Sequence, residues 1–145
     1  MQSEIHDPAG MEILDAAECR RLLGSVAIGR IVFTDQALPA VQPVNFLLYE
    51  GAVVFRTGAG SKLAAAARDA VVAFEADDID REYQRGWSVV VVGHAREVTE
   101  PRLRERLAEL PLRPWAPGVR DHIILIPIEV IYGRRIPPPG QRRAG

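Results

Sequence analysis

The sequence predicts a mainly β fold, a small antiparallel barrel with short helices at its ends. About six apolar, β-branched runs follow one another with short turn-like connections, as antiparallel strands do. The segments that favour helix are too short for the crossovers of a parallel sheet. With 145 residues, 48% of them hydrophobic, the chain has the length and apolar content for one buried core. It shows no internal repeat, so we expect a single domain over residues 1–145.

The composition argues against several classes of function. A net charge of −1 and a pI near 6.3 give no basic field for a nucleic acid. No apolar run approaches the ~20 residues that cross a bilayer, so no membrane partner is expected. The polar N-terminus resembles neither a signal nor a transit peptide, and the lone Cys19 rules out an internal disulfide. We therefore expect a cytoplasmic protein.

The first half of the chain begins with a helix and continues with strands. Residues 1–10 are expected to be a flexible arm, and Asp15 to cap a short helix that ends at Gly24. Strands are predicted over residues 26–34 and 38–49.

The second of these strands contains two residues that need an explanation. Pro43 cannot donate to a sheet ladder, so it belongs at an edge or a bulge. Asn45 lies in an apolar run and is either a satisfied amide or a ligand contact. Glu50 and Gly51 then form a hairpin turn into the next strand.

Residues 52–78 are the most informative stretch. A β-prone run ends at Arg56, a Gly-Ala-Gly loop follows, and an alanine-rich helix begins after Ser61. Ser61 is a good N-cap, but Ala64 stands three residues on, where a capping box has Glu or Gln. Lys62 in the first turn opposes the helix dipole. The start of this helix therefore lacks a negative charge.

Two interpretations of this feature stay open. A phosphate from outside the chain would complete the site, because glycines allow close approach and the first helical N–H groups point at it. Alternatively, the segment is a solvated turn with ordinary surface cations. The chain has 17 arginines and one lysine, Lys62. A single flexible ammonium kept beside the loop is a hint of the first interpretation.

Known phosphate-binding motifs fit the loop poorly. In a P-loop, Ser or Thr follows the Lys, whereas Ser61 precedes Lys62. A dinucleotide-binding motif fits better, since Asp77 comes at the expected distance after Gly58, but the third glycine position is Leu63. A Rossmann-type domain is therefore a remote alternative.

The remaining polar residues give weaker signals. Asp77, Asp78 and Asp80 have neither a His nor a Cys near them and match no calcium loop, so we expect a solvated turn and no metal. Gly93 is expected at a bulge or a close approach of backbones. No partner can be assigned to His94.

The end of the chain should hold one helix and a final strand. A helix is predicted over residues 100–110, with Thr99 as its cap. Pro127 is expected to break the strand run over 120–136. Residues 137–145 are expected to be a flexible tail.

Six segments carry a resemblance to a known family. They are GRIVF at 29–33, PVNF at 43–46, VVFRTGAGSKLAAA at 53–66, VAFEADDID at 72–80, GWSVVVVGHA at 86–95 and RPWAPG at 113–118. Together they resemble the pyridoxamine 5'-phosphate oxidase-like split barrels that bind flavin mononucleotide (FMN), in the short form widespread in actinobacteria. The resemblance covers about Asp15 to Ile136 and implies an antiparallel split β-barrel of Greek-key type.

The resemblance also implies a homodimer with two FMN molecules in clefts between the subunits. By position, the 5'-phosphate would be held by Arg56, Thr57, Ser61 and Lys62. The edge of the isoalloxazine ring would be met by Pro43, Val44 and Asn45. Trp87 and Ser88 match a region that approaches the flavin from the partner subunit.

The family resemblance implies an FMN-dependent oxidoreductase acting on a small molecule, with a deazaflavin as another possible cofactor. The flavin would do the redox chemistry, so no catalytic side chain is assigned. Vitamin B6 oxidases carry Arg and His near the C-terminus, whereas this chain has Arg134 and Arg135 without the His; true pyridoxamine-phosphate oxidation is therefore not expected. The alternative is a non-catalytic module that binds a flavin, deazaflavin or haem for storage or sensing. The sequence assigns no role to His94, His122, Arg134 or Arg135.

Overall fold

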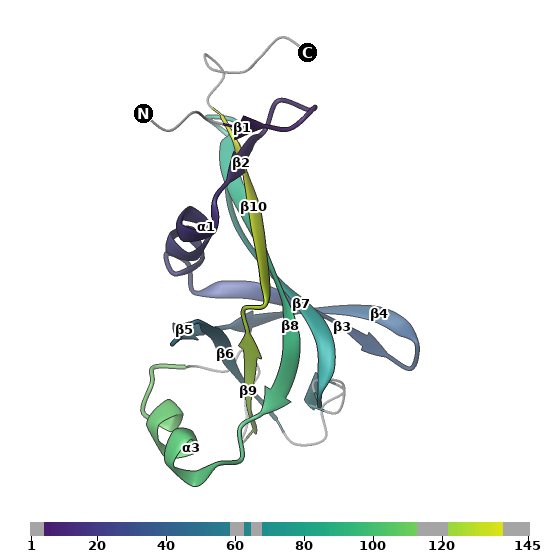
Figure 1. The fold of residues 1–145 in the computed structure, drawn as a ribbon, viewed down its shortest axis with the longest axis vertical. Helices are drawn as coiled ribbons and strands as arrows, with labels where there is room; N and C mark the ends of the chain where they lie inside the picture. The colour runs from purple at the N-terminus through teal and green to yellow at the C-terminus, as the bar shows by residue number, and fades with distance from the viewer. Residues whose placement is uncertain (1–4, 59–62, 65–67, 113–121, 138–145) are drawn as a thin grey trace.

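The structure is a computed structural model, and it describes residues 5–58, 63–64, 68–112 and 122–137. Over these ranges it contains ten strands and two complete helices (Figure 1). In chain order the elements are β1 (Ile5–His6), β2 (Glu12–Leu14), α1 (Ala16–Leu23), β3 (Ile28–Asp35), β4 (Leu38–Asn45), β5 (Leu47–Tyr49), β6 (Ala52–Thr57), β7 (Ala70–Asp80), β8 (Arg85–Glu97), α3 (Pro101–Ala108), β9 (His122–Pro127) and β10 (Val130–Ile136).

The strands form one continuous, strongly curled antiparallel sheet. Its main path runs β1-β2-β10-β8-β7-β3-β4, and β9 joins β8 to β6, which also pairs with β5. Figure 1 shows the long strands β7, β8 and β10 side by side, with β5, β6 and β9 around their lower part. Because β6 and β7 each pair antiparallel with other strands, they do not form a βαβ unit. The fold is therefore a split β-barrel as expected, and the Rossmann alternative is wrong.

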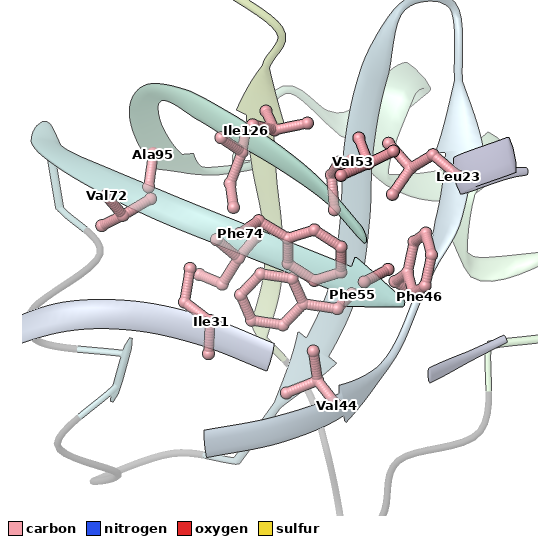
Figure 2. Close-up of a cluster of buried hydrophobic side chains, with 14 of the residues drawn as sticks. Leu23, Ile31, Val44, Phe46, Val53, Phe55, Val72, Phe74, Ala95 and Ile126 are labelled. Atoms are coloured by element: carbon pink, nitrogen blue, oxygen red, sulfur yellow. The ribbon is translucent and has the colours of Figure 1, made fainter. Parts of the chain in front are cut away.

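Aromatic and branched side chains fill the inside of the curled sheet. The rings of Phe46 and Phe74 meet edge to face at 4.7 Å between centroids, and Phe55 and Ile31 are fully buried beside them (Figure 2). Each such side chain contributes about 1.5–3 kcal/mol through burial. This core fixes β3, β6 and β7 relative to one another.

A second core lies on the other face of β6 and β9. Val54 and Leu125 pack there with Leu107 of α3 and with Val98 and Leu112. The two strands are thus covered on both faces, and their sequences AVVF and IILI are continuously apolar for that reason.

The N-termini of α1 and α3 are each capped by a carboxylate. Asp15 caps α1 as predicted, accepting from the Glu18 backbone N–H at 2.8 Å, and Gly24 ends the helix. The predicted cap of the later helix, Thr99, is wrong. Glu100 caps α3, with its carboxylate accepting from the backbone N–H groups of Arg102 and Leu103. Pro101 opens α3, and the residue before a proline is held extended, which places Glu100 at the cap.

The predicted strand over residues 38–49 is two strands. Phe46 interrupts it: its backbone N–H donates to the Ala27 carbonyl oxygen and its ring turns into the core. Pro43 lies in β4, which pairs with β3 alone among the described strands, so the predicted edge position is confirmed. At the other end of the sheet, Ile5–His6 pairs with β2, so this part of the predicted flexible arm forms a strand.

Gly93 lies at a close approach of two backbone segments, as predicted. A Cβ atom at this position would come within 2.0 Å of the carbonyl oxygen of Pro127, the last residue of β9. Only a residue without a side chain fits between β8 and the connection to β10.

Candidate functional site

The end of β6 holds the two described members of the predicted phosphate site. Arg56 is half-buried, whereas Thr57 and Gly58 are buried. Since successive residues of a strand point to opposite faces, Thr57 shares the barrel side with Phe55, and Arg56 shares the α3 side with Val54. Ser61 and Lys62 lie outside the described residues.

Part of the helix predicted after the Gly-rich loop is present among the described residues. Leu63 and Ala64 are helical and buried, so the predicted order of strand, loop and helix holds at its described positions. Buried Gly58 gives the chain a position without a side chain directly after Thr57. The described part of this segment has the order of strand, glycine and helical residues that a phosphate site uses.

The three predicted flavin-edge residues lie on the edge strand β4. Val44 is buried in the same cluster as Phe55 of β6, so β4 and the end of β6 belong to one region (Figure 2). Pro43 and Asn45 point to the opposite, outer face of the sheet. Val44 can thus offer only its backbone to a ligand.

Trp87 and Ser88 lie on β8, away from β4 in the sheet. β7 and β3 separate β8 from β4 in the sheet, so one chain does not bring these residues to Pro43 and Asn45. Trp87 is 9% exposed and faces inward, and Ser88 faces outward. The indole borders a pocket of about 400 Å³, which is also lined by Asp78, Asp80, Arg85, Gly86, Arg135 and Ile136.

The outer face of the sheet carries an apolar row across five strands. The register aligns Val130 of β10, Val92 of β8, Ala73 of β7, Val32 of β3 and Val41 of β4. Val41 and Val130 are 62% and 52% exposed. We call these five residues the apolar row. Pro43 and Ser88 lie on the same outer face.

An ionic cluster lies beside the apolar row. Arg30 Nη1 is 3.2 Å from a carboxylate oxygen of both Glu75 and Asp77. Burial raises the pKa of Glu75 to about 7, and Asp77 adds to the shift while Arg30 opposes it. Two carboxyl groups therefore share one guanidinium.

The predicted solvated turn of acidic residues is wrong for two of its members. Asp77 and Asp78 lie within β7, and Asp80 alone accepts from the turn, at the backbone N–H groups of Glu82 and Tyr83. The described residues contain no group of three or more potential metal ligands among His, Cys, Asp and Glu.

Arg134 and Arg135 are both engaged within the chain. Arg135 donates to Glu12 at 2.7 Å and to Glu18 at 2.6 Å, and Arg134 lies 3.4 Å from Asp7. Hydrogen bonds from Arg21 and then Arg135 lower the pKa of Glu18 to about 2. These arginines tie the first strands and α1 to β10.

Two histidine–carboxylate pairs were not predicted. His94 Nδ1 lies 2.9 Å from Glu129, and His122 Nδ1 contacts Glu97. Each pair joins residues 25 or 35 positions apart in the chain. Only the strand register, which the sequence does not specify, reveals them.

The described part of the chain contains no helix that is long and apolar enough to span a membrane.

Comparison with known proteins places this architecture in a family. A curled antiparallel sheet with two cores and an exposed proline-containing edge strand defines a split-barrel protein. The family described as pyridoxamine 5'-phosphate oxidase matches residues 15–135. The chain belongs to this family.

Similar proteins are found in several bacteria. An uncharacterised Mycobacterium tuberculosis protein, Rv0080, is 45% identical over 128 residues, which is 85% of this chain and 84% of the relative. The structure of an FAD binding protein from Mycobacterium smegmatis is 41% identical, with a TM-score of 0.72 over 85% of this chain and 95% of the other. A candidate pyridoxamine 5'-phosphate oxidase from Corynebacterium glutamicum is 30% identical, with a TM-score of 0.74 over 87% and 93% of the two chains.

Proposed function

We propose that this protein binds FMN and acts as a flavin-dependent oxidoreductase on a small molecule. The observation that carries the proposal is the end of β6, where half-buried Arg56 and buried Thr57 precede Gly58 and a helical segment. A guanidinium, a hydroxyl and backbone N–H groups are the groups that hold a phosphate. Ser61 and Lys62 complete the phosphate site in this proposal.

The protein's own residues bind and orient the cofactor. A bound flavin supplies the hydride and electron chemistry. Pro43 and Asn45 lie on the outer face of the edge strand, and β4 offers backbone groups along its unpaired edge in the described sheet. The apolar core behind Val44 excludes water from one side of that strand.

We propose further that the protein is a homodimer whose cofactor sites lie between subunits. Trp87 and Ser88 are too far along the sheet to join Pro43 in one chain, so in a dimer they serve the partner's site. The apolar row and the ion-paired Arg30 cluster form a face of the kind that a second copy covers.

FAD is a second candidate cofactor. The Mycobacterium smegmatis structure that is 41% identical to this chain is described as an FAD binding protein. FAD and FMN share the isoalloxazine ring and the first phosphate, so the β6 site serves either. The larger nucleotide needs additional space beyond that phosphate.

The purified protein tests the proposal. We expect a yellow protein whose flavin absorbance is bleached by a reduced nicotinamide nucleotide, and mass spectrometry of the heat-released chromophore then identifies FMN, FAD or a deazaflavin. Colour without turnover would favour the non-catalytic binding module, and a haem spectrum would favour the haem-binding version of that module. A colourless protein that ignores added FMN and FAD would contradict the flavin proposal.

A further inference from the structure

His122 lies directly opposite the proposed phosphate site. In the β6–β9 ladder, Thr57 pairs with His122, at the first residue of β9. Side chains of directly paired residues project from the same face with Cβ atoms roughly 4.5–5.5 Å apart. Buried Thr57 and the imidazole of His122 are therefore neighbours at the point where the chain enters the Gly-rich loop.

Glu97 orients this histidine. It lies at the end of β8 and pairs in register with Ile124, two residues after His122 on the same face of β9. Its carboxylate contacts Nδ1 of His122, and the two side chains are 23% and 26% exposed. With Nδ1 engaged, Nε2 is the ring nitrogen that can meet a ligand.

The contact also determines which groups Nε2 can meet: a donor when the ring is neutral and an acceptor when the ring is the imidazolium. A carboxylate at Nδ1 accepts a hydrogen bond from the ring N–H, so Nε2 donates only when the ring is the imidazolium. An imidazolium between Glu97 and a second group is stable when that group is an anion, because both neighbours then accept hydrogen bonds from the cation. A phosphate meets this requirement.

We propose that His122 is a further phosphate-binding residue, which donates from Nε2 to the cofactor phosphate while Glu97 positions the ring. This inference rests on the proposed function and adds a residue that comes from β9 and not from the β6 loop. Among the described residues, Glu97 is the charged group recorded in contact with the ring.

The chain contains a matched control. His94 and Glu129 form the same kind of pair, with Nδ1 2.9 Å from the carboxylate. Glu129 lies two residues beyond the last residue of β9, whereas His122 is the first residue of this strand, so the control pair lies near its opposite end. A substitution of His94 therefore removes a similar contact away from the phosphate.

Titration of the same protein with FMN and with riboflavin tests the proposal, because riboflavin lacks the phosphate. We expect His122→Leu to weaken FMN binding about tenfold or more, as loss of a charge-assisted hydrogen bond does, and to leave riboflavin affinity within about twofold. Glu97→Gln should weaken FMN less, and His94→Leu should change neither ligand.

Three other outcomes would contradict the proposed role of His122. Equal losses for FMN and riboflavin would assign His122 a structural role at the β8–β9 contact, and unchanged FMN affinity would remove it from the site. Both results overturn the inference and leave the flavin proposal standing. A wild type that binds neither ligand would overturn both.

Discussion

Glu75 illustrates how a single residue departs from its ordinary chemistry. Its side chain is 27% exposed, shares Arg30 with Asp77 and has a pKa raised from 4.5 to about 7, chiefly by burial. The folded chain thus holds this proton more tightly than the unfolded chain does. The stability that it contributes is present below about pH 4.5 and is lost as pH rises through about 7.

Replacement of Glu75 by Gln should remove this loss. We expect Glu75→Gln to be more stable than the wild type by about 1–2 kcal/mol near pH 8, and equal to it near pH 4. Urea unfolding at both pH values measures the difference, with the exposed Glu105→Gln as the control. A variant less stable than the wild type near pH 8 would show that the carboxylate's attraction to Arg30 outweighs its burial.

At the residue scale, local chemistry was predictable from the sequence and long-range chemistry was not. Asp15 was identified as a cap because its partner N–H lies three residues away. The Thr99 prediction failed by one position, since Pro101 shifts the start of α3. The contact between His122 and Glu97 depends on two ladders between strands that are distant in sequence. No local pattern carries that information.

At the scale of elements, backbone contacts decide where strands bend and end. β8 runs for 13 residues and serves two parts of the sheet, pairing with β10 and β7 along most of its length and with β9 at its end. Gly93 allows β8 to pass the end of β9 within contact of a carbonyl oxygen. The alternation of apolar residues predicted the strands, whereas Phe46 divided one of them because its ring is needed in the core.

A methyl group at Gly93 should push β8 away from the end of β9. We expect Gly93→Ala to lower the free energy of unfolding by about 1–3 kcal/mol or more, because the carbonyl of Pro127 is backbone and cannot rotate away. Gly24→Ala is the control, since a Cβ there meets its nearest atoms at 3.6 Å and the backbone is helical. Thermal unfolding of both variants measures the difference. Equal stabilities would mean that the connection after β9 moves freely.

For the whole molecule, the central feature is the exposed outer face. The apolar row crosses five strands, and the predicted cofactor residues Pro43 and Ser88 lie on the same side. The sequence predicted the barrel, because the strand patterns and the segments that resemble the family extend along most of the chain. It could not show this row, since adjacent members come from strands up to 41 positions apart, as Ala73 and Val32 do.

A charge placed in the apolar row should prevent dimerisation. Val41 and Leu38 both lie on β4 and are 62% and 69% exposed, but they point to opposite faces. We expect the wild type to sediment at twice the 16.0 kDa chain mass, Val41→Glu to shift toward the monomer, and Leu38→Glu to stay dimeric. A monomeric wild type would exclude shared cofactor sites.

The most direct test of the account is equilibrium binding of FMN to the wild type and to the double variant Arg56→Ala/Lys62→Ala. Each lost charge-assisted contact to the phosphate costs about 1.5–3 kcal/mol, so we expect the dissociation constant for FMN to rise roughly 100-fold or more. Riboflavin binding should change far less. An unchanged dissociation constant for FMN in the folded double variant would contradict the placement of the phosphate at the end of β6.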